Sequence, residues 1–465
     1  MKSIRSKLLM AIAAVTVSTA IVVGSLVYSI SREALGKTSF DKLIAVRELK
    51  ADQVDSFFRT IRDQVIALSA NRMLIDAMES FSGAFDDALA PDPTLDAAVL
   101  RTFYAEEFMT RARAAQAPVD NVTDLWPADP RSQRMQHLYL AANPFPVGEK
   151  YQLDRSSDTS RYADVHANYH PFLRDFSKRF GFYDLFLVDA ESGYIVYSVE
   201  KEIDFATSLL DGPYRNSNIA KVFREARVSN NANFVRMVDF ESYMPSYGAQ
   251  ASFLASPIFA GNQVIGVLIV QVPLDRLNHI MTSGEAWSEV GLGETGETYI
   301  VGPDLKVRTQ PRFLVSDPET FFDDIAAAGI EPTTRDRMRS LGSAVGLLTV
   351  DTAGTRMALD GQAGAQIFDD YRGQPVLSAY RKLGLPDVDW AIMSEKDQAE
   401  AFAETLRLRN LIAGLVLFTA IIAIGLAWLI ARNLVAPLRA LRDSANRLAD
   451  GDLDVGLNID RGDEI

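Results

Sequence analysis

The sequence has no cysteine, and it has only four histidines among its 465 residues. Without cysteine the chain forms no disulfide, no thiolate metal site and no cysteine nucleophile. Its formal net charge is −14, and no segment gathers lysine and arginine into a basic stripe. Nucleic acid is therefore not an expected partner, because its recognition relies on such a stripe. The length allows two or three domains, each with its own core.

Charge is also absent from two long apolar runs, residues 8–30 and 411–431. As helices, both runs reach across the roughly 30 Å hydrocarbon core of a membrane. Small residues around positions 18–20 leave a cleaved signal peptide as an alternative for the first run. The first run is longer than a signal core, however, so we expect two transmembrane helices.

Three basic residues, Lys2, Arg5 and Lys7, come before the first run. Positive charge of this kind stays in the cytoplasm, so residues 1–7 are expected on that side. Two crossings then place residues 31–410 outside and residues 432–465 inside.

The segment that follows the first run, within residues 31–135, has a helical period. Val54, Phe58, Ile61, Val65 and Leu68 alternate steps of four and three residues, which predicts one apolar stripe on a long helix. The helix packs on its own domain, or part of the stripe meets a second subunit as a coiled-coil seam; both can hold at different heights along the helix. The rest of this region, residues 82–135, is expected to be helical and irregular, with no chemistry of its own.

From Phe182 onward the period changes to that of β-strands. Residues 182–199 and 251–277 predict two hairpins, and residues 296–310 and 374–402 repeat the strand–turn–strand pattern. The order of hairpin, insert, hairpin and helix thus occurs twice. This repeat predicts an α+β fold with two copies of one unit, each an antiparallel sheet, over residues 136–280 and 281–402.

The order of these parts resembles the double Cache (dCache) sensors of bacterial transmembrane receptors. The stretches "AANPFPVGEKYQLD", "RYADVHANYHPFLRDF" and "PSYGAQASFLASPIF" look like a subgroup common in methyl-accepting chemotaxis proteins. The resemblance implies two tandem PAS-like Cache units in the periplasm and a multi-pass location in the bacterial inner membrane. It also implies a homodimer or higher oligomer, and a small-molecule ligand held by the membrane-distal unit, residues 136–280.

The tail, residues 432–465, is similar to a HAMP linker cut short. Leu434, Leu438, Leu441, Ala445 and Leu448 step by four and three residues, as a bundle-forming helix does. A helix lying on the lipid surface is the alternative. The resemblance implies a signal relay through Pro437, Leu438, Leu441, Gly451 and Glu464, and an output domain beyond Ile465 that contacts cytoplasmic signalling proteins.

Aromatic and polar residues in the first sheet unit are the candidates for ligand contact. Small-molecule sites combine aromatic walls with a few polar groups, and an arginine can grip a carboxylate with two hydrogen bonds. The alternative is a set of core aromatics and surface charges. The arginine-then-tryptophan-tyrosine run of amino-acid-binding relatives is not found, so the ligand class stays open. The candidates are Tyr183, Asp184, Tyr197, Tyr214, Arg215, Asn216, Asp239, Tyr243 and Tyr247.

No motif predicts an enzyme, a cofactor or a metal within these residues. "GLGETG" (291–296) has the glycine spacing of a dinucleotide fingerprint, but a β-rich run follows it where a helix is required. His166 and His170 lie one helical turn apart, as a metal pair does. Hydrogen-bonded histidines are the interpretation that we prefer.

The function predicted is transmembrane signal input. One hypothesis is a chemoreceptor that continues into a methylated helical hairpin. The other is a receptor enzyme that continues into an adenylate or guanylate cyclase, a histidine kinase or a diguanylate cyclase. A transporter or a membrane-anchored binding protein is a third possibility, which the lack of charge within the two spans disfavours.

Overall fold

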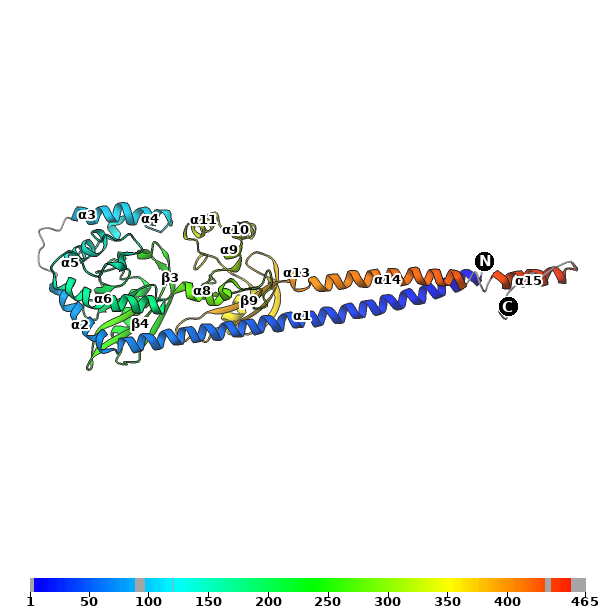
Figure 1. The fold of residues 1–465 in the computed structure, drawn as a ribbon, viewed down its shortest axis with the longest axis horizontal. Coiled ribbons are helices and arrows are strands. Elements are labelled where there is room, and N and C mark those ends of the chain that lie inside the picture. Colours follow the sequence, from blue (N-terminus) through cyan, green and yellow to red (C-terminus); the bar gives the residue numbers. More distant parts are fainter. Residues whose placement is uncertain (1–3, 88–96, 120, 431–435, 453–465) are drawn as a thin grey trace. The chain divides into compact units, whose positions relative to one another are not determined.

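The computed structural model describes residues 4–87, 97–119, 121–430 and 436–452 (Figure 1). The chain divides into two compact units, one made of Met1–Asp41 with Gln398–Ile465 and the other of Lys42–Asp397. Helix α1 (Ile4–Ser69) begins in the first unit and ends in the second. The chain therefore passes between the units twice, within α1 and after Asp397.

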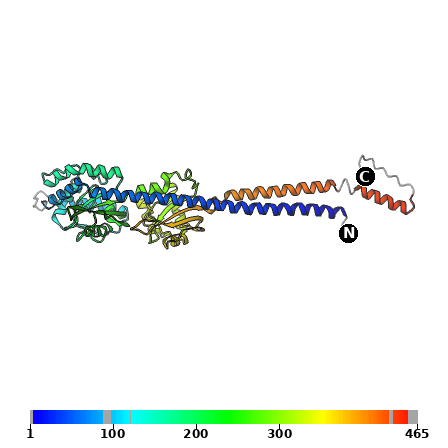
Figure 2. The same cartoon turned by 90° about the horizontal axis from the view of Figure 1, so that it is seen from below.

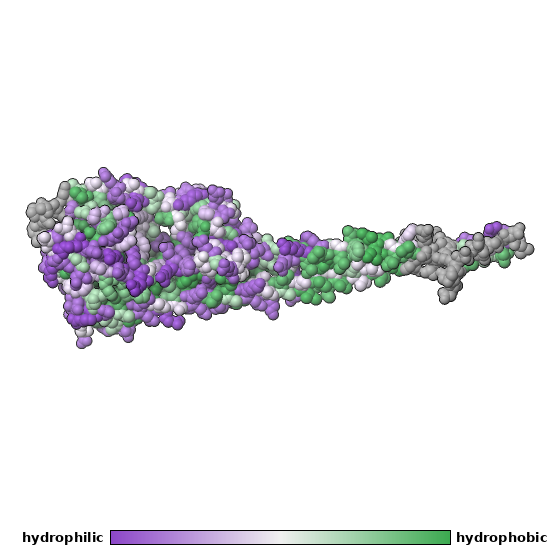
Figure 3. All heavy atoms as spheres, in the orientation of Figure 1, coloured by the Kyte–Doolittle hydropathy of each residue, from purple (hydrophilic) through white to green (hydrophobic). Residues whose placement is uncertain are grey.

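Two helices of the first unit carry the apolar runs. Residues 8–30 fall in α1, and α14 (Ala403–Ile430) holds nearly all of residues 411–431. By length and composition both helices are able to cross a membrane, and Figure 3 shows apolar residues gathered on these segments. A Cβ added to Gly24 would lie 2.6 Å from Ile412 Cγ2. A glycine at that position therefore lets the two helices approach closely, as small residues do between membrane helices.

The second unit contains two antiparallel sheets, which makes the fold α+β as predicted. The first sheet has five strands in the order β2-β1-β5-β4-β3, and the second has four in the order β6-β9-β8-β7. The strands are β1 (Leu185–Asp189), β2 (Ile195–Ser198), β3 (Arg236–Tyr243), β4 (Ala249–Ala260), β5 (Gln263–Gln271), β6 (Glu297–Val301), β7 (Gly364–Asp369), β8 (Pro375–Lys382) and β9 (Ala391–Asp397).

Three of the four predicted hairpins are confirmed. β1 pairs with β2, with Leu187 opposite Tyr197. β4 pairs with β5 around a turn at Gly261, whose φ of 62° is the left-handed conformation that glycine favours. β8 pairs with β9. Strands β3 and β7, which complete the sheets, were not predicted.

The predicted hairpin at 296–310 forms only in part. Leu305 turns the backbone at a φ of 61°, Val301 bridges Val307, and the Arg308 N–H donates to Ile300 O at 2.7 Å, but the returning segment is too short to count as a full strand. On its other side, the Val307 N–H donates to Leu348 O at 3.1 Å. This segment occupies the place that β2 has in the first sheet, since β1-β5-β4-β3 and β6-β9-β8-β7 have the same order.

Helices surround both sheets. The longer ones near the first sheet are α2 (Arg72–Asp87), α6 (Arg161–Phe180) and α7 (Asn218–Arg227), and α8 (Leu274–Thr282) connects it to the second. The short helices before α6 are α3 (Ala97–Thr102), η1 (Phe103–Phe108), α4 (Met109–Ala114), η2 (Val122–Asp124), α5 (Pro130–Gln136), η3 (His137–Ala141) and η4 (Lys150–Gln152). The remainder are η5 (Met244–Ser246), η6 (Ser283–Glu285), α9 (Arg312–Ser316), α10 (Pro318–Ala327), α11 (Pro332–Leu341), α12 (Ala353–Leu359), α13 (Gln398–Ala401) and α15 (Ala436–Ala449).

The apolar stripe of α1 faces its own domain. All five residues from Val54 to Leu68 are at most 4% exposed, and their core includes Phe186 of the first sheet and Ile392 of the second. Figure 2 shows the part of α1 that belongs to this unit passing along both sheets. These five residues therefore pack on the chain's own sheets.

Two partly buried carboxylates, Asp239 and Asp387, join the sheets to each other. Asp239 on β3 accepts hydrogen bonds from Arg308 Nε (2.8 Å) and Nη2 (2.9 Å), and from Trp390 Nε1 (2.9 Å). Asp387 accepts from the Met237 N–H and from the side chains of Arg62 and Arg236. A two-pronged arginine–carboxylate pair fixes orientation as well as distance. These hydrogen bonds form a joint that holds β3 against Arg308, which follows β6, and against the connection between β8 and β9.

The Asp239→Ala variant tests this joint. Removing one partner of a buried ion pair costs about 3–5 kcal/mol. Arg308 keeps a second carboxylate, Asp304 at 2.8 Å, so we expect a loss of about 2 kcal/mol in the free energy of unfolding. Urea unfolding of the chain in detergent micelles, followed by tryptophan fluorescence, measures it. The exposed Asp323→Ala is the control, and an equal loss in both variants would contradict the assignment.

Candidate functional site

A cavity lies at the end of β2, in the module of the five-stranded sheet. Its volume is about 60 Å³, and both aromatic and charged side chains form its wall. A space of that size holds only water, so a larger solute requires the wall to move. The lining residues are Phe103, Phe108, Leu140, Val147, Gly148, Lys150, Tyr183, Glu200, Lys201, Glu202, Ile203, Pro245 and Tyr247.

Tyr183 reaches the cavity because α6 ends just before it. Ser160 caps the start of α6 by accepting the Ala163 N–H, and Gly181 ends the helix at a φ of 79°. A left-handed residue at that place is the usual stop of a helix. The chain then turns into β1, with Tyr183 directly before it.

Glu202 is the central polar group of the cavity wall. One carboxylate oxygen accepts from Tyr183 OH at 2.8 Å, and the other accepts from Ser246 Oγ at 2.8 Å. Burial and the nearby charge of Asp204 raise the pKa of Glu202 to about 8. The nearby charge of Glu202, with burial, raises the pKa of Tyr183. A positive charge in the cavity would lower the pKa of both Glu202 and Tyr183, because it favours their ionised forms.

A second layer of polar groups lies behind Glu202. Tyr243 OH donates to Asp204 Oδ2, and burial raises the pKa of Asp204 to about 6. Asp204 Oδ1 and Tyr214 OH are buried and have no hydrogen-bond partner among the described residues. Buried oxygens of this kind are rare without water or ligand nearby, so this layer has acceptor capacity to spare.

Lys201 is a buried lysine held in an unusual backbone conformation. Its φ is 59°, its Nζ donates to Ser198 O, and the same atom lies 4.5 Å from the ring centroid of Tyr197. Burial lowers the pKa of Lys201 to about 7, against the opposing charges of Asp184 and Glu200. A bulky residue in the left-handed region often marks a functional site.

The structure brings some of the nine predicted ligand residues together. Tyr183 and Tyr247 line the cavity, and Tyr243 and Tyr214 stand behind it. The ring of Tyr197 lies against Lys201 Nζ, and its hydroxyl forms a hydrogen bond with His170 Nδ1 at 2.7 Å.

The other four do not line the cavity. Asp184 accepts the N–H groups of Leu185, Val199 and Glu200, which fixes the end of the β1–β2 pair. Asp239 belongs to the joint between the sheets. Arg215 and Asn216 are exposed, so Arg215 offers no grip for a carboxylate in this cavity.

The two histidines are hydrogen-bonded, as preferred above. His166 Nδ1 meets Asp154 O at 2.8 Å, and His170 Nε2 meets Tyr151 O at 2.7 Å. Their rings stack at 4.3 Å. Burial and the charge of Lys201 lower the pKa of both, so they are neutral.

Several cavity residues were missed from the sequence. Phe103 and Phe108 come from η1, inside the region for which no chemistry was predicted. Glu200, Lys201 and Glu202 form a charged triplet directly after the fully buried strand β2. Charges at the end of an apolar strand are a signal that was available in the sequence.

The predicted relay residues fall in and around α15. Pro437, Leu438 and Leu441 belong to this helix, and Gly451 follows it at a φ of 91°. Glu464 lies outside the described residues.

The raised pKa of Glu202 predicts a pH effect on stability. Between its ordinary pKa of 4.5 and its folded pKa of about 8, the folded chain binds more protons than the unfolded chain, so stability falls as pH rises. Lys201 acts in the opposite direction above about pH 7. The melting temperature of wild type should therefore fall relative to Glu202→Gln as pH rises through this window. Parallel curves, such as the exposed control Glu191→Gln should give, would refute it.

Three comparisons with known proteins bear on these sites. Residues 429–465 match the HAMP domain family. The chain is 24% identical over 325 residues to a Sinorhizobium fredii protein named probable chemoreceptor y4sI, a match that covers 68% of this chain. The chain spans only 36% of that relative's length.

Among solved structures, the ligand-binding domain of the Pseudomonas fluorescens chemoreceptor CtaA, in complex with L-isoleucine, is 13% identical with a TM-score of 0.30. The match covers 66% of this chain and 97% of that one. The ligand-binding domain of the Pseudomonas aeruginosa amino acid chemoreceptor PctC, in complex with GABA, is 15% identical with a TM-score of 0.30, over 64% and 100% of the two chains.

The HAMP match agrees with the order of elements described above, because residues 429–465 begin at the end of the second apolar helix, α14. The chain thus contains a HAMP domain and is homologous to a bacterial chemoreceptor.

Proposed function

We propose that this chain senses a small solute outside the cell and passes the signal through α14 to its HAMP domain. The observation that carries the proposal is the cavity beside Tyr183 and Glu202, whose wall combines aromatic and acidic side chains; behind it lies an Asp204 oxygen that has no hydrogen-bond partner among the described residues. Such a cavity, with an aromatic wall and few polar groups, is the usual form of a small-molecule site. A homodimer in the inner membrane, with an output domain after the HAMP domain, completes the proposal.

The charges of the cavity favour a solute that carries an ammonium group. Glu202 and Glu200 line the cavity and Asp204 lies behind Glu202, while burial lowers the pKa of Lys201 to about 7, so that this lysine carries only part of its charge at physiological pH. An ammonium ion has three donors to offer to such acceptors. Phe103, Phe108 and Tyr247 supply apolar and aromatic surface for the rest of the solute.

A binding screen tests the ligand class. Isothermal titration of the chain in lipid nanodiscs would compare amino acids and amines with matched acids that lack the amino group. Loss of a hydrogen bond to a charged group costs about 1.5–3 kcal/mol, so Glu202→Gln should weaken the binding of an amine about tenfold or more. Arg215→Gln, at an exposed position away from the cavity, is the control. Binding that depends on Arg215 and ignores Glu202 would reject the cavity.

The membrane topology has a separate test, which the lack of cysteine makes simple. A single cysteine introduced by Asp323→Cys should react with an impermeant maleimide added to intact cells with a permeable outer membrane. A cysteine introduced by Asp450→Cys should react only after lysis, because two crossings return the chain to the cytoplasm. Equal labelling of both in intact cells would contradict the proposed orientation.

A further inference from the structure

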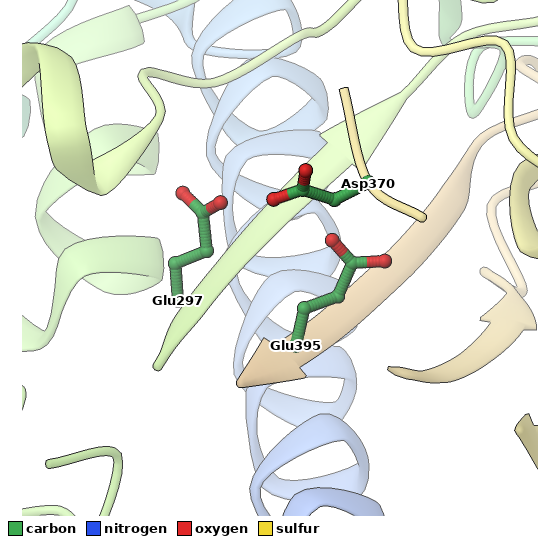
Figure 4. Close-up of side chains that lie close together, drawn as sticks. All are labelled: Glu297, Asp370 and Glu395. Atoms are coloured by element: carbon green, nitrogen blue, oxygen red, sulfur yellow. The ribbon is translucent and has the colours of Figure 1, made fainter. Parts of the chain in front are cut away.

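Three buried carboxylates converge at one end of the four-stranded sheet. Glu297 on β6, Glu395 on β9 and Asp370 in the turn after β7 are 1%, 1% and 6% exposed. Each offers an oxygen within 4.8 Å of the others, and Figure 4 shows the three carboxyl groups gathered around one space. Glu297 and Glu395 are direct partners across the β6–β9 pair. Like charges directly opposite on neighbouring strands destabilise a sheet.

Arg372 is a positive charge beside this cluster, and it is shared with a fourth carboxylate. Arg372 donates from Nε to Asp370 Oδ2 (2.7 Å) and from Nη2 to a fourth carboxylate, Asp397 Oδ1 (2.5 Å). Arg312 reaches Glu297 through its backbone N–H (3.0 Å) and directs its guanidinium at the carbonyls of Gly293 and Gly296. Burial raises the pKa of Glu297 to about 8 and that of Glu395 to about 7.

The two glutamates have only neutral side-chain donors beside them. Glu297 Oε1 and Glu395 Oε1 are buried and make no hydrogen bond of regular geometry in the described part of the chain; the hydroxyls of Tyr371 and Ser378 face these two side chains. Ser378 is fully buried and lies directly across from Glu395 in the β8–β9 pair, so its side chain projects from the same face. Tyr299 OH satisfies only the other oxygen of Glu395, at 2.7 Å. Two buried carboxylate oxygens with incomplete hydrogen bonding leave acceptor capacity for a cation.

We propose that Glu297, Asp370 and Glu395 bind a divalent cation of the Ca²⁺ type. Every available ligand atom is an oxygen, which hard cations prefer over softer metals. Ca²⁺ lies roughly 2.3–2.6 Å from its ligands, so two oxygens of one site are up to about 5 Å apart. The cluster oxygens all lie within 4.8 Å of one another, which is compatible with this range. Ser378 Oγ adds a neutral ligand beside Glu395.

The site involves strands that are far apart in the sequence. A bound cation would connect β6, the turn after β7, and β9, whose last residue, Asp397, directly precedes α13. The cation would also offset the repulsion between the carboxylates of Glu297 and Glu395. Cation binding is therefore expected to stabilise this sheet, whatever solute the other module binds.

Calcium titration of the chain in nanodiscs, after chelator treatment, is the direct test. We expect one Ca²⁺ per chain by isothermal titration and a higher melting temperature with Ca²⁺. Tb³⁺ should replace Ca²⁺ and show luminescence sensitised by Tyr299 and Tyr371. No binding at millimolar Ca²⁺ and no tyrosine-sensitised Tb³⁺ signal would overturn the proposal.

The Glu395→Gln variant locates the ion. It should weaken Ca²⁺ binding by at least about tenfold, since even groups that only support a metal ligand contribute 10–100-fold. In chelator at pH 8 the same variant should melt above wild type, because it removes a like-charge pair, and it should gain little from Ca²⁺. Glu289→Gln, at an exposed position, should behave as wild type. Unchanged Ca²⁺ affinity in Glu395→Gln, or equal loss in Glu289→Gln, would reject this site.

Discussion

Burial of the apolar stripe on α1 is the contact on which the rest of Lys42–Asp397 depends. The core around Val54 and Phe58 contains residues of both sheets, and hydrophobic burial is the largest favourable contribution to folding. Polar contacts then set the order of the sheets along the helix. Arg47 donates to the carbonyls of Gly364 and Tyr380 in the second sheet. Further along α1, Ser69 Oγ lies 3.0 Å from Ser256 Oγ in the first.

The carboxylates of this unit differ in the donors that surround them. Asp239 has an arginine and a tryptophan as donors, and it acts as a structural joint. Glu202 has two neutral hydroxyl donors and faces a cavity. Glu297 and Glu395 are buried, and each keeps an oxygen without a hydrogen bond of regular geometry among the described residues. A carboxylate already paired with an arginine holds the fold, whereas one that has only neutral donors can still gain from a positive charge.

The two sheets share a strand order but carry different chemistry. Strands β1-β5-β4-β3 correspond to β6-β9-β8-β7, and only the first sheet adds β2 as a full strand. Glu200, Lys201 and Glu202, which line the cavity, directly follow this extra strand. In the second sheet, the acidic cluster is built on β6 and β9, which correspond to β1 and β5. One repeated topology therefore supports a solute cavity in one copy and an acidic cluster in the other.

The local sequence pattern was sufficient to predict most of the helices and strands, but only a few of the site residues. The apolar runs, the stripe from Val54 to Leu68 and three hairpins were predictable, because hydrophobic period and turn residues act between near neighbours. Strand β2 has no full counterpart after β6, where the returning segment pairs with β6 only through the isolated bridge of Val301 and Val307. Likewise, Asp239 and Arg215 are residue types that often contact ligands, yet Asp239 pairs with Arg308 and Arg215 faces solvent. The sequence alone determined where helices and strands form; only the tertiary structure decided which charges meet, because a charge interacts with whatever the fold brings within a few ångströms of it.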